Sequence, residues 1–259
     1  LLNVRLEVFI SGLLMGATAL IIKNPGQIFP WFALALLSNF KFQALAPTGL
    51  LLGYLVIEKK SFKELGYFLF FSMVALAVPA LFFGPKLTMM ATQEWLHWLG
   101  YALDESFYTF QHIYAFLKHT LGIELPYKVT QVLSLCLALG LLVWVLRAGK
   151  LKNISPYLRA SALGAAFVCA FSPAAQSAAF IFYAPLLLWM FLEKPKDNSK
   201  EWFVSLVVSW FFVSLSYSDL VGQAARNYFY MGAFKPVGII ALLVYLGRAD
   251  FKNFRLLKA

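Results

Sequence analysis

IFPWFALALLSNFKFQALAPTGLLLGYLVI, residues 28–57, consists of two apolar runs on either side of a polar break. The first run, residues 28–39, is twelve residues long. As a helix it would rise about 18 Å, which is short of the ~30 Å hydrocarbon core of a bilayer. Lipid cannot hydrogen-bond the backbone at such a helix end, so the break has to line protein or a water-filled cavity. The stretch therefore predicts a short membrane helix that ends at a polar break.

Comparable apolar runs recur from one end of the chain to the other. Apolar residues make up 61% of the 259 residues and charged residues only 13%, whereas a soluble domain has about 25% charged residues. The predicted membrane segments are residues 8–22, 28–39, 42–57, 67–83, 129–146, 160–171, 174–192, 202–215 and 237–246. The sequence thus predicts an all-α fold, a polytopic transmembrane helical bundle of about nine segments. We expect a single transmembrane domain, residues 1–259, and no soluble domain.

The distribution of Lys and Arg predicts the orientation of this bundle. One set of loops carries 15 of the 22 basic residues: Lys23, Lys59, Lys60, Lys63, Arg147, Lys150, Lys152, Arg159, Lys194, Lys196, Lys200, Arg248, Lys252, Arg255 and Lys258. The other set carries Arg5, Lys41, Lys86, Lys118, Lys128, Arg226 and Lys235. Because cytoplasmic loops are enriched in Lys and Arg, the first set is predicted to be cytoplasmic and the second extracytoplasmic.

Several functional classes have no support in the sequence. Cys136 and Cys169 both lie in apolar runs, which is typical of small buried residues rather than of a disulfide or a metal pair. No motif for zinc, nucleotide phosphate or dinucleotide binding occurs, so we expect no metal and no cofactor. The net charge of +10 is spread over short loops, so we expect no nucleic-acid partner. The first apolar run lacks signal-peptide features, and we expect the sequence to begin partway into a longer polypeptide.

The longest connection, residues 84–128, is predicted to be an extracytoplasmic segment with two apolar stripes. The stripes are Trp95, Trp98, Leu99 and Leu103, and then Phe107, Phe110, Tyr114, Leu117 and Leu121. Spacings of three and four residues with Trp and Tyr indicate two helices lying in the membrane interface. An ordinary folded loop packed on the bundle is the alternative.

Ionisable groups near the membrane are the first candidates for function, because they are costly there. Lys41 lies at the first polar break, where it would bind a lipid phosphate, with Gln43 assisting. Alternatively, Lys41 only extends its ammonium to the interface. Arg5 and Glu7 precede the first segment on the same side, and they would pair with each other, with Lys41 or with a substrate headgroup.

A second polar break, Ser172-Pro173, interrupts the sixth apolar region. Proline removes one backbone donor, so Ser172, Gln176 and the freed carbonyls would face a cavity, unless this is an ordinary proline kink. Gln111 and His112 lie in the extracytoplasmic connection. No carboxylate stands at a spacing from His112 that defines a catalytic dyad. These residues are therefore candidates for substrate binding, and no catalytic residue is assigned.

The order of these features resembles the C-terminal portion of the bacterial polyprenyl-phosphate-mannose-dependent mannosyltransferases, membrane glycosyltransferases of the GT-C class. Four stretches carry the resemblance: ALALLSNFKFQALAPTGLLLGYLVIEKKSFKELG, VPALFFGPKLTMMATQEWLHWL, SFYTFQHIYAFLKHTLG and AFSPAAQSAAFIFYAPLLLWM. In the third, Gln111 matches a Gln of the family pattern, and in the fourth, Pro185 matches a second proline. The resemblance implies sugar transfer from a polyprenyl phosphate to an acceptor at the extracytoplasmic face, without a metal-nucleotide site.

The sequence departs from that family in polar positions. The family's catalytic acid would lie upstream of Leu1, so this chain does not contain it. Ala174 and Ala175 stand near positions where the family carries Trp, His or Tyr, and Phe110 and His112 replace its Asn and Ser. Lost polar groups remove hydrogen bonds that would orient a sugar.

The leading hypothesis is therefore a mannosyltransferase-like membrane protein of the inner (plasma) membrane of a bacterium. Its partners would be membrane lipids, including a polyprenyl-phosphate sugar, and other membrane subunits. The alternative is a non-catalytic GT-C-like scaffold subunit of a larger membrane complex. A transporter, which would need inverted repeats, is the third possibility.

Overall fold

The computed structural model describes residues 2–40, 44–104, 112–151, 154–171, 183–193, 200–215 and 219–258. For residues 2–7, 95–104, 127, 219 and 255–258 it describes the backbone alone. The helices are α1 (Leu2–Lys23), α2 (Ile28–Phe40), α3 (Leu45–Glu58), α4 (Lys63–Phe83), α5 (Pro85–Asp104), α6 (Ile113–Leu121), α7 (Tyr127–Ala148), α8 (Pro156–Ala170), α9 (Ala184–Leu192), α10 (Lys200–Val213), α11 (Gln223–Met231) and α12 (Lys235–Lys258), with a 3₁₀ turn, η4 (Asp219–Val221). Throughout these ranges the chain is helical without a strand, which confirms the predicted all-α class.

Helix boundaries agree with the two predicted polar breaks. α2 ends at Phe40 and α3 begins at Leu45, and α8 ends at Ala170, just before Ser172-Pro173. The connection 84–128 contains two helices, α5 and α6, as predicted. α12 is longer than its predicted segment, residues 237–246, because its regular helix continues past the apolar run into the basic C-terminal residues.

Within the described ranges, α4 and α7 are the two helices that are each long and apolar enough to cross a bilayer. α11 and α12, bent by 68° at the residues between them, make a third such segment if they are counted together. The apolar helices α2 and α3 have only 13 and 14 residues, so each rises about 20 Å, less than the hydrocarbon core. The structure thus supports a membrane protein, whereas the number of nine segments stays a prediction.

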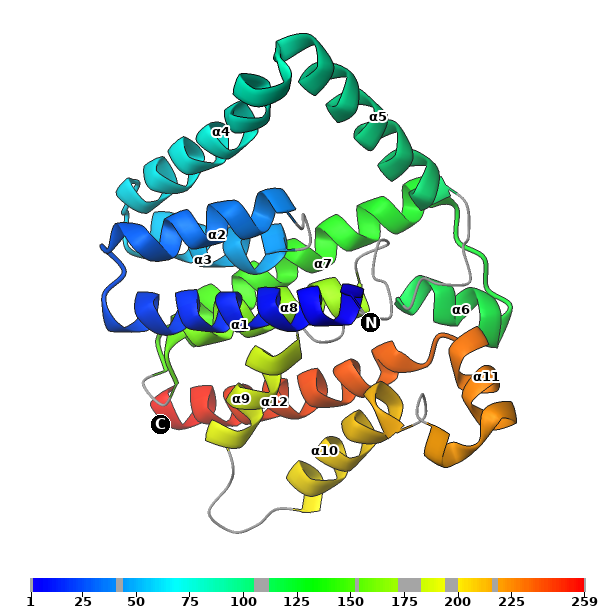
Figure 1. Cartoon of the computed structure of the whole chain (residues 1–259). Helices are drawn as coiled ribbons and strands as arrows, with labels where there is room; N and C mark the ends of the chain where they lie inside the picture. Colours follow the sequence, from blue (N-terminus) through cyan, green and yellow to red (C-terminus); the bar gives the residue numbers. More distant parts are fainter. Residues whose placement is uncertain are drawn as a thin grey trace.

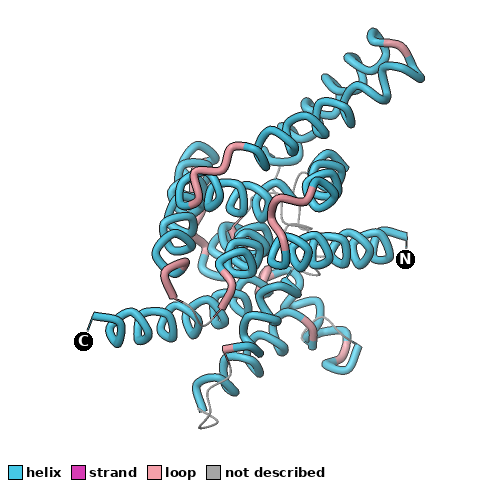
Figure 2. The backbone as a smooth tube through the Cα atoms, turned by 90° about the vertical axis from the view of Figure 1, so that its left-hand side faces the viewer, coloured by secondary structure: helices cyan, strands magenta, loops and turns pink. Residues whose placement is uncertain are grey.

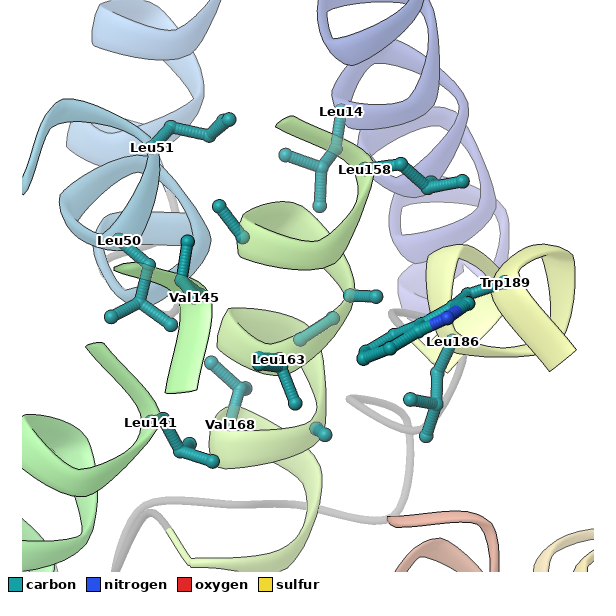
Figure 3. Packing of buried hydrophobic residues seen from close by; sticks show 14 of the residues in the cluster. Leu14, Leu50, Leu51, Leu141, Val145, Leu158, Leu163, Val168, Leu186 and Trp189 are labelled. Atoms are coloured by element: carbon teal, nitrogen blue, oxygen red, sulfur yellow. The ribbon is translucent and has the colours of Figure 1, made fainter. Parts of the chain in front are cut away.

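α8 lies at the centre of the packed bundle. It contacts α1, α3, α7, α9 and α12, and Figure 3 shows Leu163 and Val168 of α8 among apolar side chains of its neighbours. Small residues allow these close contacts, since Ala160, Ala162 and Ala165 are all fully buried. A Cβ atom on Gly164 would lie only 2.2 Å from the Cα atom of Pro47, so α3 crosses α8 at this glycine.

α4 and α5 form a hairpin that projects away from the rest of the bundle in both views (Figures 1 and 2). The first part of α4 packs against α2, whereas Leu81, Phe82 and Phe83 at its far end are 82%, 79% and 68% exposed. Phenylalanine and leucine side chains exposed to this extent are typical of a helix that faces lipid.

The connections rich in Lys and Arg lie at one end of the bundle, which we term the basic end. In Figure 1 the α1–α2, α3–α4 and α7–α8 connections and the end of α12 lie together at the left. The first and third of these follow Lys23 and Arg147, each in the last turn of its helix. The end of α2, the start of α3, α6 and α11 lie toward the opposite side, which we term the far end (Figure 1).

A buried ion pair ties three helices together near the basic end. Arg159 of α8 donates from Nη2 to Oδ1 of Asp250 in α12 over 3.0 Å, and the two side chains are 0% and 3% exposed. Trp144 of α7 donates from Nε1 to the second carboxylate oxygen over 2.9 Å. Arg159 also donates to the carbonyls of Ala148 and Ile154, and its guanidinium lies over the Trp189 ring. These bonds fix the α7–α8 turn against α12.

Candidate functional site

The end of α8 is where polar side chains from several helices meet. The last backbone hydrogen bond of the helix runs from the Phe171 N–H to the Phe167 carbonyl, 2.9 Å. The chain then enters Ser172-Pro173, and proline disfavours helical geometry in the residue before it. The carbonyl of Phe171 is thereby left for a partner outside the helix. Ser134 of α7 donates to it from Oγ over 3.1 Å.

A chain of hydrogen bonds continues from Ser134 to α6. The oxygen atoms of Tyr114 and Ser134 are 2.9 Å apart. Since the single proton of Ser134 goes to Phe171, the Tyr114 hydroxyl is the donor in this pair. Burial raises the pKa of Tyr114, while the bond to Ser134 lowers it. The phenol therefore stays protonated near neutral pH and holds α6 against α7 and α8.

His112, one of the predicted binding residues, caps α6. Its Nδ1 accepts a hydrogen bond from the Ala115 N–H over 3.1 Å, and its ring lies 5.7 Å from that of Tyr114. Burial, and then the nearby charge of His119, lower the pKa of His112 to about 4. At neutral pH the ring is therefore uncharged with its proton on Nε2. With a pKa this low His112 is not poised to act as a general base, and besides capping α6 it makes a further interaction within the chain.

Lys235 lies on the other side of the α8 end, at the first residue of α12. It is only 7% exposed, and its ammonium interacts electrostatically with the Cys169 thiol. Tyr183, just before α9, also interacts with Cys169 and hydrogen-bonds the Ser214 side chain at the end of α10. Buried ammonium groups are costly unless an anion or hydrogen-bond acceptors compensate them. Lys235 has a further interaction within the chain, so its ammonium is compensated at least in part by the protein itself.

We refer to His112, Tyr114, Ser134, Cys169, Tyr183, Ser214 and Lys235 as the α8-end cluster. Its members come from α6, α7, α8 and α12 and from the residues that flank α9 and α10. None of the seven carries a carboxylate, so the cluster offers a cation, a thiol, hydroxyls and an imidazole N–H. Such a set can bind a phosphate or the hydroxyls of a sugar. It does not by itself supply a general base.

Of the predicted binding residues, His112 is the one that the structure describes with its side chain. Arg5 and Glu7 lie in the first turns of α1, where the backbone alone is described. Lys41, Gln43, Gln111, Ser172 and Gln176 lie outside the described residues. Among their described neighbours in the chain, the end of α2 and the start of α3 lie on the side of these two helices that faces away from the basic end (Figure 1). Phe171, which precedes Ser172, belongs to the hydrogen-bond chain of the α8-end cluster.

Sequence reasoning missed Lys235, Cys169 and Tyr183. The sequence pattern places Lys235 among the loop cations. Its position only two residues before the last apolar run is the signal that could have indicated a buried lysine. Cys169 and Tyr183 lie within predicted apolar segments, and nothing in their local pattern indicates that they approach Lys235. The acid Glu124, which the sequence predicts to be extracytoplasmic, lies apart from this chemistry, since it is exposed and pairs with Lys118 over 2.6 Å.

Comparison of the chain with models of protein families, with curated proteins and with solved structures gave no match.

Proposed function

We propose that this chain is the membrane portion of a GT-C-type glycosyltransferase, which binds a polyprenyl-phosphate sugar and transfers the sugar, mannose in our proposal, to an acceptor at the extracytoplasmic face. In this proposal the far end of the bundle is extracytoplasmic, and about nine segments cross the inner membrane of a bacterium. The sequence resemblance, carried by four stretches between residues 33 and 190, suggests the class.

The observation that carries the proposal is the burial of Lys235 in the α8-end cluster. Beside the interaction that it makes within the chain, a lysine that is 7% exposed at the end of an apolar bundle would attract a ligand that brings a negative charge and an apolar tail. A polyprenyl phosphate has both features. Its phosphate would lie against Lys235, with Lys41 and Gln43 as further ligands, and its chain would lie along the lipid-facing helices.

The sugar would then lie near His112, Gln111, Ser172 and Gln176. The Nε2–H of His112 is a donor for a sugar hydroxyl or a phosphate oxygen. Arg5 and Glu7 at the start of α1 would contact the headgroup from the same end. The α8-end cluster contains no carboxylate to activate an acceptor, so the catalytic acid of this proposal lies outside these residues.

The absence of a carboxylate from the cluster also favours the second candidate, a non-catalytic GT-C-like scaffold subunit of a membrane complex. In that role the α8-end cluster would only hold helices together, and the exposed apolar side chains of α4 would contact neighbouring subunits. The two functions differ in ligand binding, because a scaffold has no need to recognise a lipid phosphate.

The test is binding of undecaprenyl phosphate to the purified chain in nanodiscs, with undecaprenol as the phosphate-free reference. We expect the phosphate to bind at least tenfold more tightly than the alcohol. Lys235→Met, which keeps the aliphatic volume, should abolish this difference, and Lys41→Ala should do the same. Lys128→Met, at an exposed lysine in the first turn of α7, is the matched control and should leave binding unchanged.

Equal binding of the phosphate and the alcohol by the unchanged chain would rule out the donor site and favour the scaffold. A preference for phosphate that survives Lys235→Met would remove Lys235 from the site. Each variant is first checked for an unchanged elution profile and melting temperature, so that loss of binding is not confused with loss of folding.

A further inference from the structure

α11 carries an exposed apolar stripe that the proposed function does not use. Together with the preceding 3₁₀ turn it presents Leu220, Ala224, Tyr228 and Met231, at spacings of four, four and three residues. Leu220, Tyr228 and Met231 are 86%, 64% and 58% exposed. The spacing places Ala224, Tyr228 and Met231 on one side of α11, beside the exposed polar residues Gln223 and Asn227, and Leu220 precedes the helix in η4.

The other side of α11 is anchored to the bundle by aromatic contacts. Phe229 packs edge-on against Phe211, Phe212 and Phe234, with ring centroids 5.3–6.2 Å apart. Gly222, with φ of 80°, begins the helix in a conformation that favours glycine. A Cβ atom on Gly232, at the other end, would meet the Phe234 ring at 2.4 Å. α11 therefore has a fixed direction, at 68° to α12.

α6 contacts the turn between α11 and α12. Thr120 of α6 donates to the Gly232 carbonyl over 2.8 Å, and the Phe116 and Phe234 rings are 5.2 Å apart. The two helices lie side by side at the far end of the bundle (Figure 1). Leu121 and Ile123, at the end of α6, are 55% and 48% exposed. We term these five residues, Leu121, Ile123, Leu220, Tyr228 and Met231, the α6–α11 rim.

We infer that the α6–α11 rim lies in the membrane interface, with its apolar side chains between lipid headgroups and acyl chains. If α12 runs along the membrane normal, a 68° bend turns α11 close to the membrane plane. A helix in that plane buries apolar side chains on one side and keeps polar ones in water, as α11 does. Tyrosine is enriched at this depth, which suits the exposed Tyr228. Lipid is therefore the occupant that both the direction and the composition of α11 favour.

The experiment places nitroxide labels on α11 in the whole chain, reconstituted in phosphatidylcholine–phosphatidylglycerol nanodiscs with Cys136→Ser and Cys169→Ala. Labels at Met231→Cys and Leu220→Cys report the rim, and labels at Gln223→Cys and Asn227→Cys report the polar side. Met73→Cys on α4, 63% exposed, is the lipid reference. We expect the rim labels to collide severalfold more with oxygen than with a water-soluble nickel chelate, and the polar-side labels to show the reverse.

Two outcomes would overturn the inference. Higher collision with the nickel chelate at both rim positions would place the rim in water. Low collision with both reagents at both rim positions would mean that a protein surface covers it. Because oxygen and nickel collisions do not depend on polyprenyl-phosphate binding, the result is independent of the proposed function.

Discussion

Arg159 illustrates how residue burial changes an interpretation drawn from the sequence. Its place between apolar runs predicts a cytoplasmic loop cation, but the structure buries it completely in α8. Its partner Asp250 lies 91 residues further along the chain, and no local pattern links the two. Two charges withdrawn from solvent are tolerated here because they face each other and because Trp144 and two carbonyls supply further hydrogen bonds to them.

We predict that Asp250→Ala destabilises the chain strongly. It leaves the Arg159 guanidinium buried without its carboxylate, and removing one partner of a buried pair costs about 3–5 kcal/mol. Glu124→Ala, which breaks the exposed Lys118–Glu124 pair, is the matched control and should cost far less, because solvent screens that pair. Unfolding in detergent, followed by tryptophan fluorescence, measures both. Equal losses in the two variants would contradict the assigned role of the buried pair.

At the scale of elements, the crossing of α3 and α8 depends on one missing side chain. Gly164 brings α8 against the backbone of α3, with three α3 backbone atoms within 3.0 Å of the place a Cβ would occupy. Backbone atoms cannot turn away as a flexible side chain can, so an added methyl group has to push the helices apart. The crossing in turn positions α8, whose end carries Cys169 of the α8-end cluster.

We therefore predict that Gly164→Ala destabilises the chain by about 1–3 kcal/mol through overpacking, despite the better helix propensity of alanine. Gly49→Ala in α3 is the control, since a Cβ there has no atom within 4 Å, and it should be neutral or slightly stabilising. The melting temperatures of the two variants in the same detergent provide the comparison. A melting temperature of Gly164→Ala at or above that of the unchanged chain would refute the close crossing.

The elements themselves could be predicted from sequence better than their contacts. Apolar runs and polar breaks predict where α2, α3 and α8 end, because proline and polar residues act on the backbone locally. The contact at Gly164 depends on residues more than a hundred positions apart, and so does the bond from Thr120 to Gly232. The α8-end cluster is of this second kind. Of its seven residues, His112 alone is among the predicted binding residues. The other six come together only through contacts between segments that are distant in the sequence.

At the scale of the whole molecule, the two ends differ in chemistry. The basic end contains the connections that follow Lys23 and Arg147, together with the buried Arg159–Asp250 pair. The far end contains the α8-end cluster and the α6–α11 rim. The positive-inside tendency predicts that the basic end is cytoplasmic, so the cluster would face the extracytoplasmic side, where lipid-linked sugars would have to be presented for this reaction.

We predict that this orientation is visible in intact cells with cysteines introduced at the two ends in a Cys136→Ser, Cys169→Ala background. Glu124→Cys, in the exposed loop after α6, should react with a membrane-impermeant maleimide from outside. Gln27→Cys, in the exposed α1–α2 turn, should react only after the membrane is permeabilised. The reverse pattern would place Lys235 and His112 on the cytoplasmic side. Transfer from a lipid-linked sugar at the extracytoplasmic face would then be excluded. The described packing of the helices would be unaffected, because it does not depend on which end of the bundle faces the cytoplasm.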